Sequence, residues 1–421
     1  MPIENLRSTS IQINETQSET CLICGRIKLL CRNSKCKNTI KTESIIRNNS
    51  HLNSNSINGS TPPGIFVGHF GYPKVHLSPM LPPYYGDTEI LDTPERWFGK
   101  SIDEIVDYRY SLIRASKPTN VFDVRNGGKF IEMIQELAMA SKPIDLELQL
   151  TKKPQKKISF NENSRPFGPS APLQSLKTPN ISVDGRIEKA YYDKDQDAKN
   201  SICKLYRDGV LVTRIQKAFS TGNLGIGRKR KMVPTKWSIT TVDDVISLAL
   251  INEIKQHPTI DNFQVYTLRN LDNIYVTILL PQPWKFEWVE AWFPTTTWNK
   301  SGLETQIIGD YEGYSKRKTY ARVGGCYYST RLATAEALSR EKRQAGAILL
   351  REIHPGYTLP IGVWNVRESI REQLKQKPIT FDDINNTLRY AFSQLTIPAN
   401  KWIANSSLLK EALYQKMITE F

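Results

Sequence analysis

Four cysteines lie within 16 residues near the start of the chain, and they form the clearest chemical feature of the sequence. The other two cysteines, Cys203 and Cys326, stand alone. Because thiols stay reduced inside a cell, four closely spaced thiolates suit one metal ion better than two disulfides. The spacing Cys-x2-Cys-x6-Cys-x4-Cys therefore predicts a metal site. Its ligands are Cys21, Cys24, Cys31 and Cys36.

Zinc is the ion that this ligand set favours, because four thiolates complete its tetrahedral coordination. A complete set leaves no open position for a substrate, so we expect a structural role. An iron–sulfur cluster also takes four thiolates, and the sequence leaves that alternative open. Arg26, Lys28 and Arg32 lie among the ligands, where they would offset negative charge and could also contact phosphate.

The chain carries a net charge of +15, and most of the excess lies in one stretch. Residues 152–236 hold 19 Lys and Arg against seven Asp and Glu, whereas residues 237–421 are nearly balanced at 21 against 19. Such a concentration favours a polyanionic partner, with nucleic acid as the leading class. The alternative is that the lysines at 152–157 form a solvated linker and the rest is ordinary surface.

Within this stretch, residues 220–236 form a basic segment with several glycines, STGNLGIGRKRKMVPTK. Backbone N–H groups near Gly222, Gly225 and Gly227, followed by cations, are suited to phosphate. The Lys-Ser/Thr ending of a nucleotide-binding P-loop is missing, so contact with a DNA backbone is the favoured interpretation and a plain basic turn the alternative. The predicted DNA-binding residues are Arg228, Lys229, Arg230, Lys231 and Lys236.

No catalytic motif is identifiable, so enzyme activity stays open. A metal-dependent nuclease would need carboxylates such as Asp243, Asp244, Asp310 and Glu312 to converge, and their spacing does not show that they do. Asp243 and Asp244 are better explained as charges that favour the first turn of a helix. The tryptophans between residues 284 and 298 could stack on bases, but their positions on alternating strands favour the core.

The composition indicates a globular protein. A length of 421 residues allows about two or three domains. The apolar fraction of 39% is too high for a wholly disordered chain, and the mean hydropathy of −0.43 is too low for an integral membrane protein. No apolar run reaches the roughly 20 residues that span a bilayer, and the first residues lack a secretory signal pattern. We therefore expect a cytoplasmic protein with no membrane partner.

Hydrophobic periodicity predicts an α+β fold with a mixed central sheet and flanking helices, preceded by a small four-Cys metal knuckle. The segments 263–268 and 273–280 are expected to form a β-hairpin. Among the other expected elements are helices at 102–110, 130–138, 193–208 and 245–254, and strands at 210–215 and 285–292.

Composition shifts divide the chain into five parts. The tract at 48–60 is rich in Asn and Ser, which is typical of a flexible linker. The expected parts are a metal-binding module at 1–47, this linker, an N-terminal part of the core at 61–200, a C-terminal α+β part at 201–400, and a helix with a tail at 401–421.

Five longer segments carry a specific resemblance to known proteins. They read TPPGIFVGHFGYPKV at 61–75, TGNLGIGRKRKMVPTKWSITTVDD at 221–244, EWVEAWFP at 287–294, YARVGGCYYSTRLA at 320–333 and KRQAGAILLREIHPGYTLPIGVWNVRE at 342–368. Together with the four cysteines, they make the chain similar to the archaeal Nre-type DNA repair proteins over nearly its whole length after the linker. The resemblance implies a role in the DNA damage response.

The resemblance also implies a contact with the sliding clamp (PCNA) that encircles DNA. Gln415, Ile418 and Phe421 fit the Gln-x-x-aliphatic-x-x-aromatic spacing of clamp-binding, PIP-like peptides. In such peptides the Gln hydrogen-bonds in a polar slot, and a short helical turn directs the apolar side chains into one pocket. The second aromatic residue that many such motifs carry is absent. The alternative is that Leu408, Leu409 and Phe421 pack a last helix on the core.

These features together predict a DNA-binding repair factor, associated with the nucleoid, that is recruited to the sliding clamp. The alternative is an RNA-binding enzyme that modifies or processes RNA, in which the knuckle and the basic segment hold structured RNA.

Overall fold

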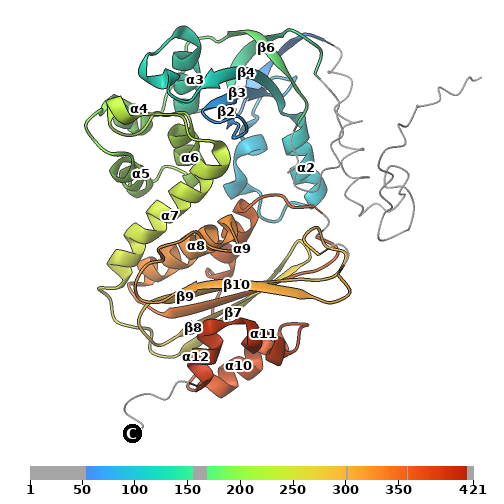
Figure 1. Ribbon diagram of the computed structural model, residues 1–421, viewed down its shortest axis with the longest axis vertical. Helices are drawn as coiled ribbons and strands as arrows, with labels where there is room; N and C mark the ends of the chain where they lie inside the picture. Colours follow the sequence, from blue (N-terminus) through green and yellow to red (C-terminus); the bar gives the residue numbers. More distant parts are fainter. Residues whose placement is uncertain (1–53, 155–167, 300–301, 358, 415–421) are drawn as a thin grey trace, which may run out of the picture.

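The structure is a computed structural model that describes residues 54–154, 168–299, 302–357 and 359–414. The four predicted metal ligands and the three predicted clamp-binding residues lie outside these ranges. Within them the α+β class is confirmed, but the strands form two mixed six-stranded sheets instead of one central sheet (Figure 1).

The first sheet has the strand order β1-β5-β6-β4-β3-β2, in which β4 and β6 pair in parallel and the other neighbours pair antiparallel. In β5 the sequence IDLELQL buries every second residue, as expected for a strand with one face on a core. Ile131 and Ile134 of α3 (Lys129–Met139) belong to that core. The strands are β1 (Ser56–Thr61), β2 (Gly64–Val67), β3 (Lys74–Leu81), β4 (Ile113–Asn120), β5 (Ile144–Leu150) and β6 (Ser170–Lys177).

Part of the predicted flexible linker is in fact a strand. Residues 56–60 belong to β1, which pairs antiparallel with β5 from Ser56 opposite Gln149 to Thr61 opposite Ile144. Ile57 is buried in the first core. The composition of this tract is typical of a tether, but sheet pairing satisfies its backbone groups and one isoleucine anchors it.

Four helices follow the first sheet, and α7 leads from it to the second (Figure 1). The predicted strand at 210–215 is wrong, because most of it lies in a helix, α6. Val212 and Ile215 are spaced for one helical face and are buried among the other helices, where no strand partner is available to them. The four helices are α4 (Gly185–Tyr192), α5 (Ala198–Arg207), α6 (Val212–Ser220) and α7 (Thr235–Ile254).

The second sheet has the order β10-β9-β11-β8-β7-β12. The predicted hairpin is confirmed as β7 and β8, joined at Leu271 and Asp272, whose φ angles of 49° and 58° match the type I′ turn of two-residue hairpins. Every residue of β8 and β11 is buried, so these strands lie inside the fold. The strands are β7 (Phe263–Asn270), β8 (Asn273–Leu280), β9 (Lys285–Trp292), β10 (Gln306–Glu312), β11 (Gly346–Ile353) and β12 (Ile379–Phe381).

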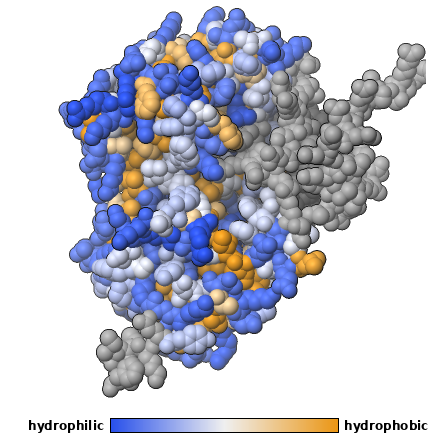
Figure 2. Space-filling view, viewed as in Figure 1, coloured by the Kyte–Doolittle hydropathy of each residue, from blue (hydrophilic) through white to orange (hydrophobic). Residues whose placement is uncertain are grey.

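Helices cover both faces of the second sheet, which makes this part of the molecule three-layered (Figure 1). One face packs against α8 and α9, and the other against α10, α11 and α12. Figure 2 shows a mostly hydrophilic exterior on one side of the molecule, with hydrophobic residues in small patches. The helices on the two faces are α8 (Gly325–Glu341), α9 (Trp364–Gln373), α10 (Ile384–Ser393), α11 (Ala399–Asn405) and α12 (Ser407–Tyr414). A further helix, α2 (Ile102–Ser111), precedes β4 of the first sheet.

None of the helices in the described ranges is both long enough and apolar enough to cross a membrane.

A buried ionic cluster lies where α7 and α9 meet. The Arg367 guanidinium donates to Asp243 Oδ1 at 3.0 Å and to Glu368 Oε1 at 3.0 Å, and its side chain is 1% exposed. Burial alone would lower the pKa of Arg367, but the carboxylates of Asp243 and Glu368 outweigh burial and raise this pKa above its ordinary value. Asp243 also accepts hydrogen bonds from Gln216 and Ser329, so three side chains bind its carboxylate, although burial still raises the pKa of Asp243.

Replacing Arg367 by Met should therefore destabilise the fold strongly, because the Asp243 carboxylate would stay buried without its cation. We expect a loss of about 3–5 kcal/mol in the free energy of unfolding, measured by urea denaturation. The matched control is Arg207→Met, which removes an exposed pair with Glu253 and should cost less than about 1 kcal/mol. Equal losses in the two variants would contradict a dominant role for the buried cluster.

Candidate nucleic-acid interface

The basic loop, residues 221–234 between α6 and α7, is held firmly against the rest of the fold. Met232 N donates to Val121 O at 2.8 Å, and Val233 N donates to Ser220 O at 2.8 Å. At its tip, Gly227 N donates to Lys194 O at 2.9 Å. Backbone bonds to three separate segments therefore fix the course of the loop.

The first half of the loop faces inward. Residues 221–225 are all buried, and Asn223 Nδ2 donates to Gln135 O at 2.9 Å. Gly222 has a φ of 74°, and a Cβ there would lie 3.1 Å from Lys231 O. Glycine is therefore needed at position 222, because the backbone there is left-handed and lies close to Lys231 of the same loop. These glycines pack the loop and do not present a cradle for phosphate.

Arg230 is a structural residue of the loop, contrary to the expectation that it contacts DNA. Its side chain is buried, with Nε donating to Gly225 O at 2.7 Å and Nη2 to Asp193 O at 3.2 Å. The guanidinium also lies 5.3 Å from the centre of the Tyr191 ring. Burial lowers the pKa of Arg230. Arg230 thus fixes the loop from inside. The sequence shows only four consecutive basic residues, so it does not indicate that Arg230 is buried while its neighbours are exposed.

The other four predicted contacts are exposed. Arg228 and Lys229 lie in a short 3-10 turn at Gly227–Lys229, Lys231 follows the buried Arg230, and Lys236 lies in the first turn of α7. Because the backbone beneath them is hydrogen-bonded, these cations project from a fixed frame. Such a frame is suited to phosphate groups at defined spacings.

Exposed aromatic side chains lie beside these cations. Trp237 is 45% exposed and its ring centroid lies 5.4 Å from that of Tyr72, which is 39% exposed. Val67 N donates to Thr235 Oγ1 at 2.9 Å, which joins the end of β2 to the start of α7. The loop between β2 and β3 and the first turn of α7 therefore form one surface.

Comparison with known proteins identifies the family. The family described as Archaeal Nre, N-terminal, matches residues 30–299, and Archaeal Nre, C-terminal, matches residues 312–421. The chain belongs to the archaeal Nre family. The family resemblance of the five quoted segments is thus confirmed.

Three curated Nre proteins are similar over most of their length. DNA repair protein NreB of Archaeoglobus fulgidus is 44% identical over 364 residues, or 86% of this chain and 91% of the relative. DNA repair protein NreA of the same organism is 36% identical, with 89% and 93% covered, and NreA of Haloferax volcanii is 32% identical, with 80% and 83% covered. The quoted segments suggest NreA in particular, but identity is higher to NreB than to either NreA. No solved structure matches this Nre chain.

The carboxylates considered for a nuclease are each paired with arginine in the Nre fold. Arg331 bridges Asp244 and Glu312, and Arg317 binds Asp310 with Nη1 to Oδ1 at 2.6 Å. Asp243 lies in the middle of α7, which begins at Thr235, and not in a first turn as expected. Within the described ranges, no three His, Cys, Asp or Glu side chains are grouped so that they could hold a metal ion.

Some of the tryptophans predicted to lie in the core do so, and another is exposed. Trp284 and Trp288 are 1% and 0% exposed, which confirms the prediction for them, whereas Trp298 is 38% exposed and stacks near Tyr357. The aromatic side chains beside the basic loop come from other segments. Sequence reasoning missed them because Tyr72 and Trp237 lie 165 positions apart and meet only in the fold.

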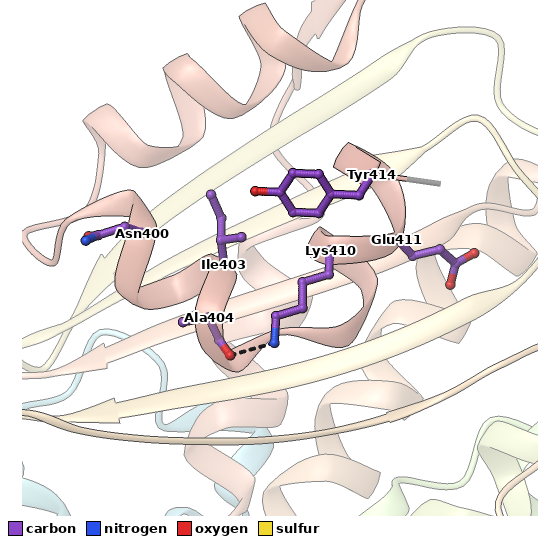
Figure 3. A pocket seen from close by; sticks show the side chains of 6 residues that line it. All are labelled: Asn400, Ile403, Ala404, Lys410, Glu411 and Tyr414. Atoms are coloured by element: carbon purple, nitrogen blue, oxygen red, sulfur yellow. Dashed lines mark hydrogen bonds between the residues drawn. The ribbon is translucent and has the colours of Figure 1, made fainter. Parts of the chain in front are cut away.

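The C-terminal helices of this Nre chain end beside an open pocket of about 660 Å³ (Figure 3). Leu408 and Leu409 are buried against the second sheet, as the core-packing alternative expects. Glu287 of β9 accepts from Ser407 N at 2.7 Å and so caps the start of α12. The pocket is lined by Asn400, Ile403, Ala404, Lys410, Glu411 and Tyr414.

Proposed function

We propose that this Nre protein is a DNA-binding repair factor that is recruited to the sliding clamp through its C-terminal peptide. The observation that carries the DNA-binding part is the hydrogen-bonded basic loop together with the first turn of α7, which carry four exposed cations, Arg228, Lys229, Lys231 and Lys236. Its relatives are DNA repair proteins, which makes DNA the natural polyanion. A nucleoid-associated location in the cytoplasm belongs to the same proposal.

Phosphate contacts of this kind bind DNA with weak sequence preference and strong salt dependence, because each neutralised phosphate releases counterions. The buried Arg230 supports the proposal indirectly. It holds the loop so that its neighbours point outward, and a loop ordered in advance loses less entropy on binding.

Replacing the four outward cations together by Ala should lower DNA affinity by at least about tenfold at low salt. The slope of log affinity against log salt should fall in magnitude by up to about 3 to 4, since each phosphate contact contributes about 0.9. Fluorescence anisotropy over a salt series measures both quantities. Arg230 is left in place, so that the loop keeps its course.

The matched control removes the same residue types from the far part of the fold, as Lys375→Ala, Lys377→Ala, Arg389→Ala and Lys401→Ala, all at exposed positions. This variant has the same net charge and should keep the wild-type salt slope within error. If both variants change the slope equally, the loop has no special role. A structured RNA competitor in the same assay tests the RNA-binding alternative, which would be favoured if RNA displaced DNA at matched ionic strength.

The clamp-binding peptide is proposed to comprise Gln415, Ile418 and Phe421, which lie outside the described residues. What supports it is the spacing of these residues and the anchoring of the preceding helix. Leu408 and Leu409 hold α12 on the sheet, while Tyr414 at its end is 73% exposed. A peptide that follows Tyr414 would start from a fixed point at the surface.

Deleting residues 415–421 should abolish clamp binding and leave DNA affinity unchanged, because the deleted residues include the apolar anchors of the peptide. Phe421→Ala should weaken clamp binding strongly by itself. The control Tyr414→Ala, just before the peptide, should change it by less than about twofold. Isothermal titration with the purified clamp gives these values. Wild-type clamp affinity in the deleted chain would show that the peptide assignment is wrong.

Zinc remains the proposed metal for Cys21, Cys24, Cys31 and Cys36, with an iron–sulfur cluster as the alternative. Elemental analysis of the full chain should find one zinc per chain, and Cys24→Ser with Cys31→Ser should remove it. The control Cys326→Ser should retain the metal. Iron with acid-labile sulfide in the wild-type protein would contradict the zinc assignment.

A further inference from the structure

Two exposed aromatic side chains, Tyr72 and Trp237, meet on the molecule, and an exposed third, Phe70, lies in the same loop as Tyr72. Phe70 is 81% exposed, Trp237 45% and Tyr72 39%. Phe70 and Tyr72 lie in the loop between β2 and β3, and Trp237 lies in the first turn of α7. Side chains of this size usually have most of their surface covered, so a group of exposed ones indicates a binding surface.

Hydrogen bonds tie this aromatic group to the basic loop. Pro73 O accepts from Val121 N at 3.0 Å, and Val121 O accepts from Met232 N at 2.8 Å. These bonds bring the segment that carries Lys231 next to the one that carries Tyr72, and Lys236 precedes Trp237 in the first turn of α7. We call the set Phe70, Tyr72, Trp237, Lys231 and Lys236 the aromatic-basic surface.

The loop between β2 and β3, which carries Phe70 and Tyr72, is also held by backbone hydrogen bonds. Gly68 N donates to His76 O at 2.8 Å, and Lys74 N donates to Gly71 O at 2.9 Å, so that backbone bonds close the loop behind Phe70. The rings of Tyr72 and Trp237 are inclined at 54°, which leaves part of each ring face open. Rings held in this way lose little conformational freedom when a flat partner stacks on them.

Cations alone are enough to hold duplex DNA, because its bases are stacked inside and present only their edges. Exposed rings beside cations are instead suited to a strand whose bases are unpaired, since every free base has a face for stacking. A protein partner would also cover apolar rings, but a surface flanked by lysines favours a polyanion.

We infer that Phe70, Tyr72 and Trp237 stack on unpaired bases, so that the DNA bound by this protein contains single-stranded or unpaired nucleotides. This inference rests on the proposed DNA binding and names its substrate class. The cations hold the phosphates of the strand, and the rings hold its bases. Selectivity for unpaired DNA over intact duplex then comes from the rings alone.

The test compares three oligonucleotides by anisotropy with the full-length protein: a single strand, its duplex, and a single strand with abasic sites at alternate positions. The wild type should bind the single strand at least about tenfold more tightly than the abasic strand, since one stacked base is worth that much. Phe70→Ala with Trp237→Ala should lose about the same factor on the single strand, lose nothing further on the abasic strand, and keep duplex affinity.

The control variant, Tyr85→Ala with Tyr311→Ala, removes two exposed aromatic side chains at other places and should bind all three oligonucleotides as the wild type does. Unfolding curves of both variants check that they fold. The inference is overturned if the aromatic variant binds the single strand normally, if it loses affinity for strand and duplex equally, or if it loses clamp binding instead. Any of these outcomes leaves the cation test of DNA binding standing, whereas failure of the wild type to bind any DNA would remove the proposed function itself.

Discussion

The pairing of Arg367 with Asp243 is the interaction on which the arrangement of this molecule depends. It joins α9 to the middle of α7, and Arg367 Nη2 also lies 3.8 Å from Glu95, in the short 3-10 turn at Pro94–Arg96. Glu95 in turn accepts from Thr213 N at 2.9 Å, at the start of α6. Segments from the first sheet region, the helical layer and the second sheet region therefore meet at one buried arginine. A buried charge tolerates few geometries, so we expect the cluster to favour this docking, alongside the apolar packing of α6, α7 and α8.

The orientation of α7 matters because its first turn carries Lys236 and Trp237. At its N-terminal end, Thr235 accepts a hydrogen bond from Val67 of the first sheet. Further along, the helix packs on α8, which covers one face of the second sheet. The same helix thus presents the aromatic-basic surface at one end and buries Asp243 in its middle. Structure and proposed binding therefore share one element: Asp243 serves packing in the middle of this helix, and Lys236 lies at the surface in its first turn.

The sequence predicts the local elements better than their assembly. The β7–β8 hairpin and α3 follow from patterns within a few residues, where alternation or helical spacing is decisive. The strand predicted at 210–215 is wrong because a short apolar run fits both a strand and a buried helix, and only packing among α5 and α7 decides for the helix. The two sheets could not be told from one, because strand order depends on contacts far apart in sequence. For the same reason the inward direction of Arg230 and the meeting of Tyr72 with Trp237 could not be predicted.

The two proposed binding regions lie in different parts of the fold, and this separation has a physical consequence. The basic loop and the first turn of α7 lie beside the first sheet, whereas α12 lies beyond the second sheet (Figure 1). The second sheet therefore lies between the basic loop and the last described helix (Figure 1). If the peptide binds a clamp on DNA as proposed, contact between the basic loop and that DNA becomes intramolecular, which raises the effective concentration of one for the other. On these proposals, four phosphate contacts and two or three stacked bases, weak by themselves at cellular salt, would then be sufficient to keep the protein on unpaired DNA.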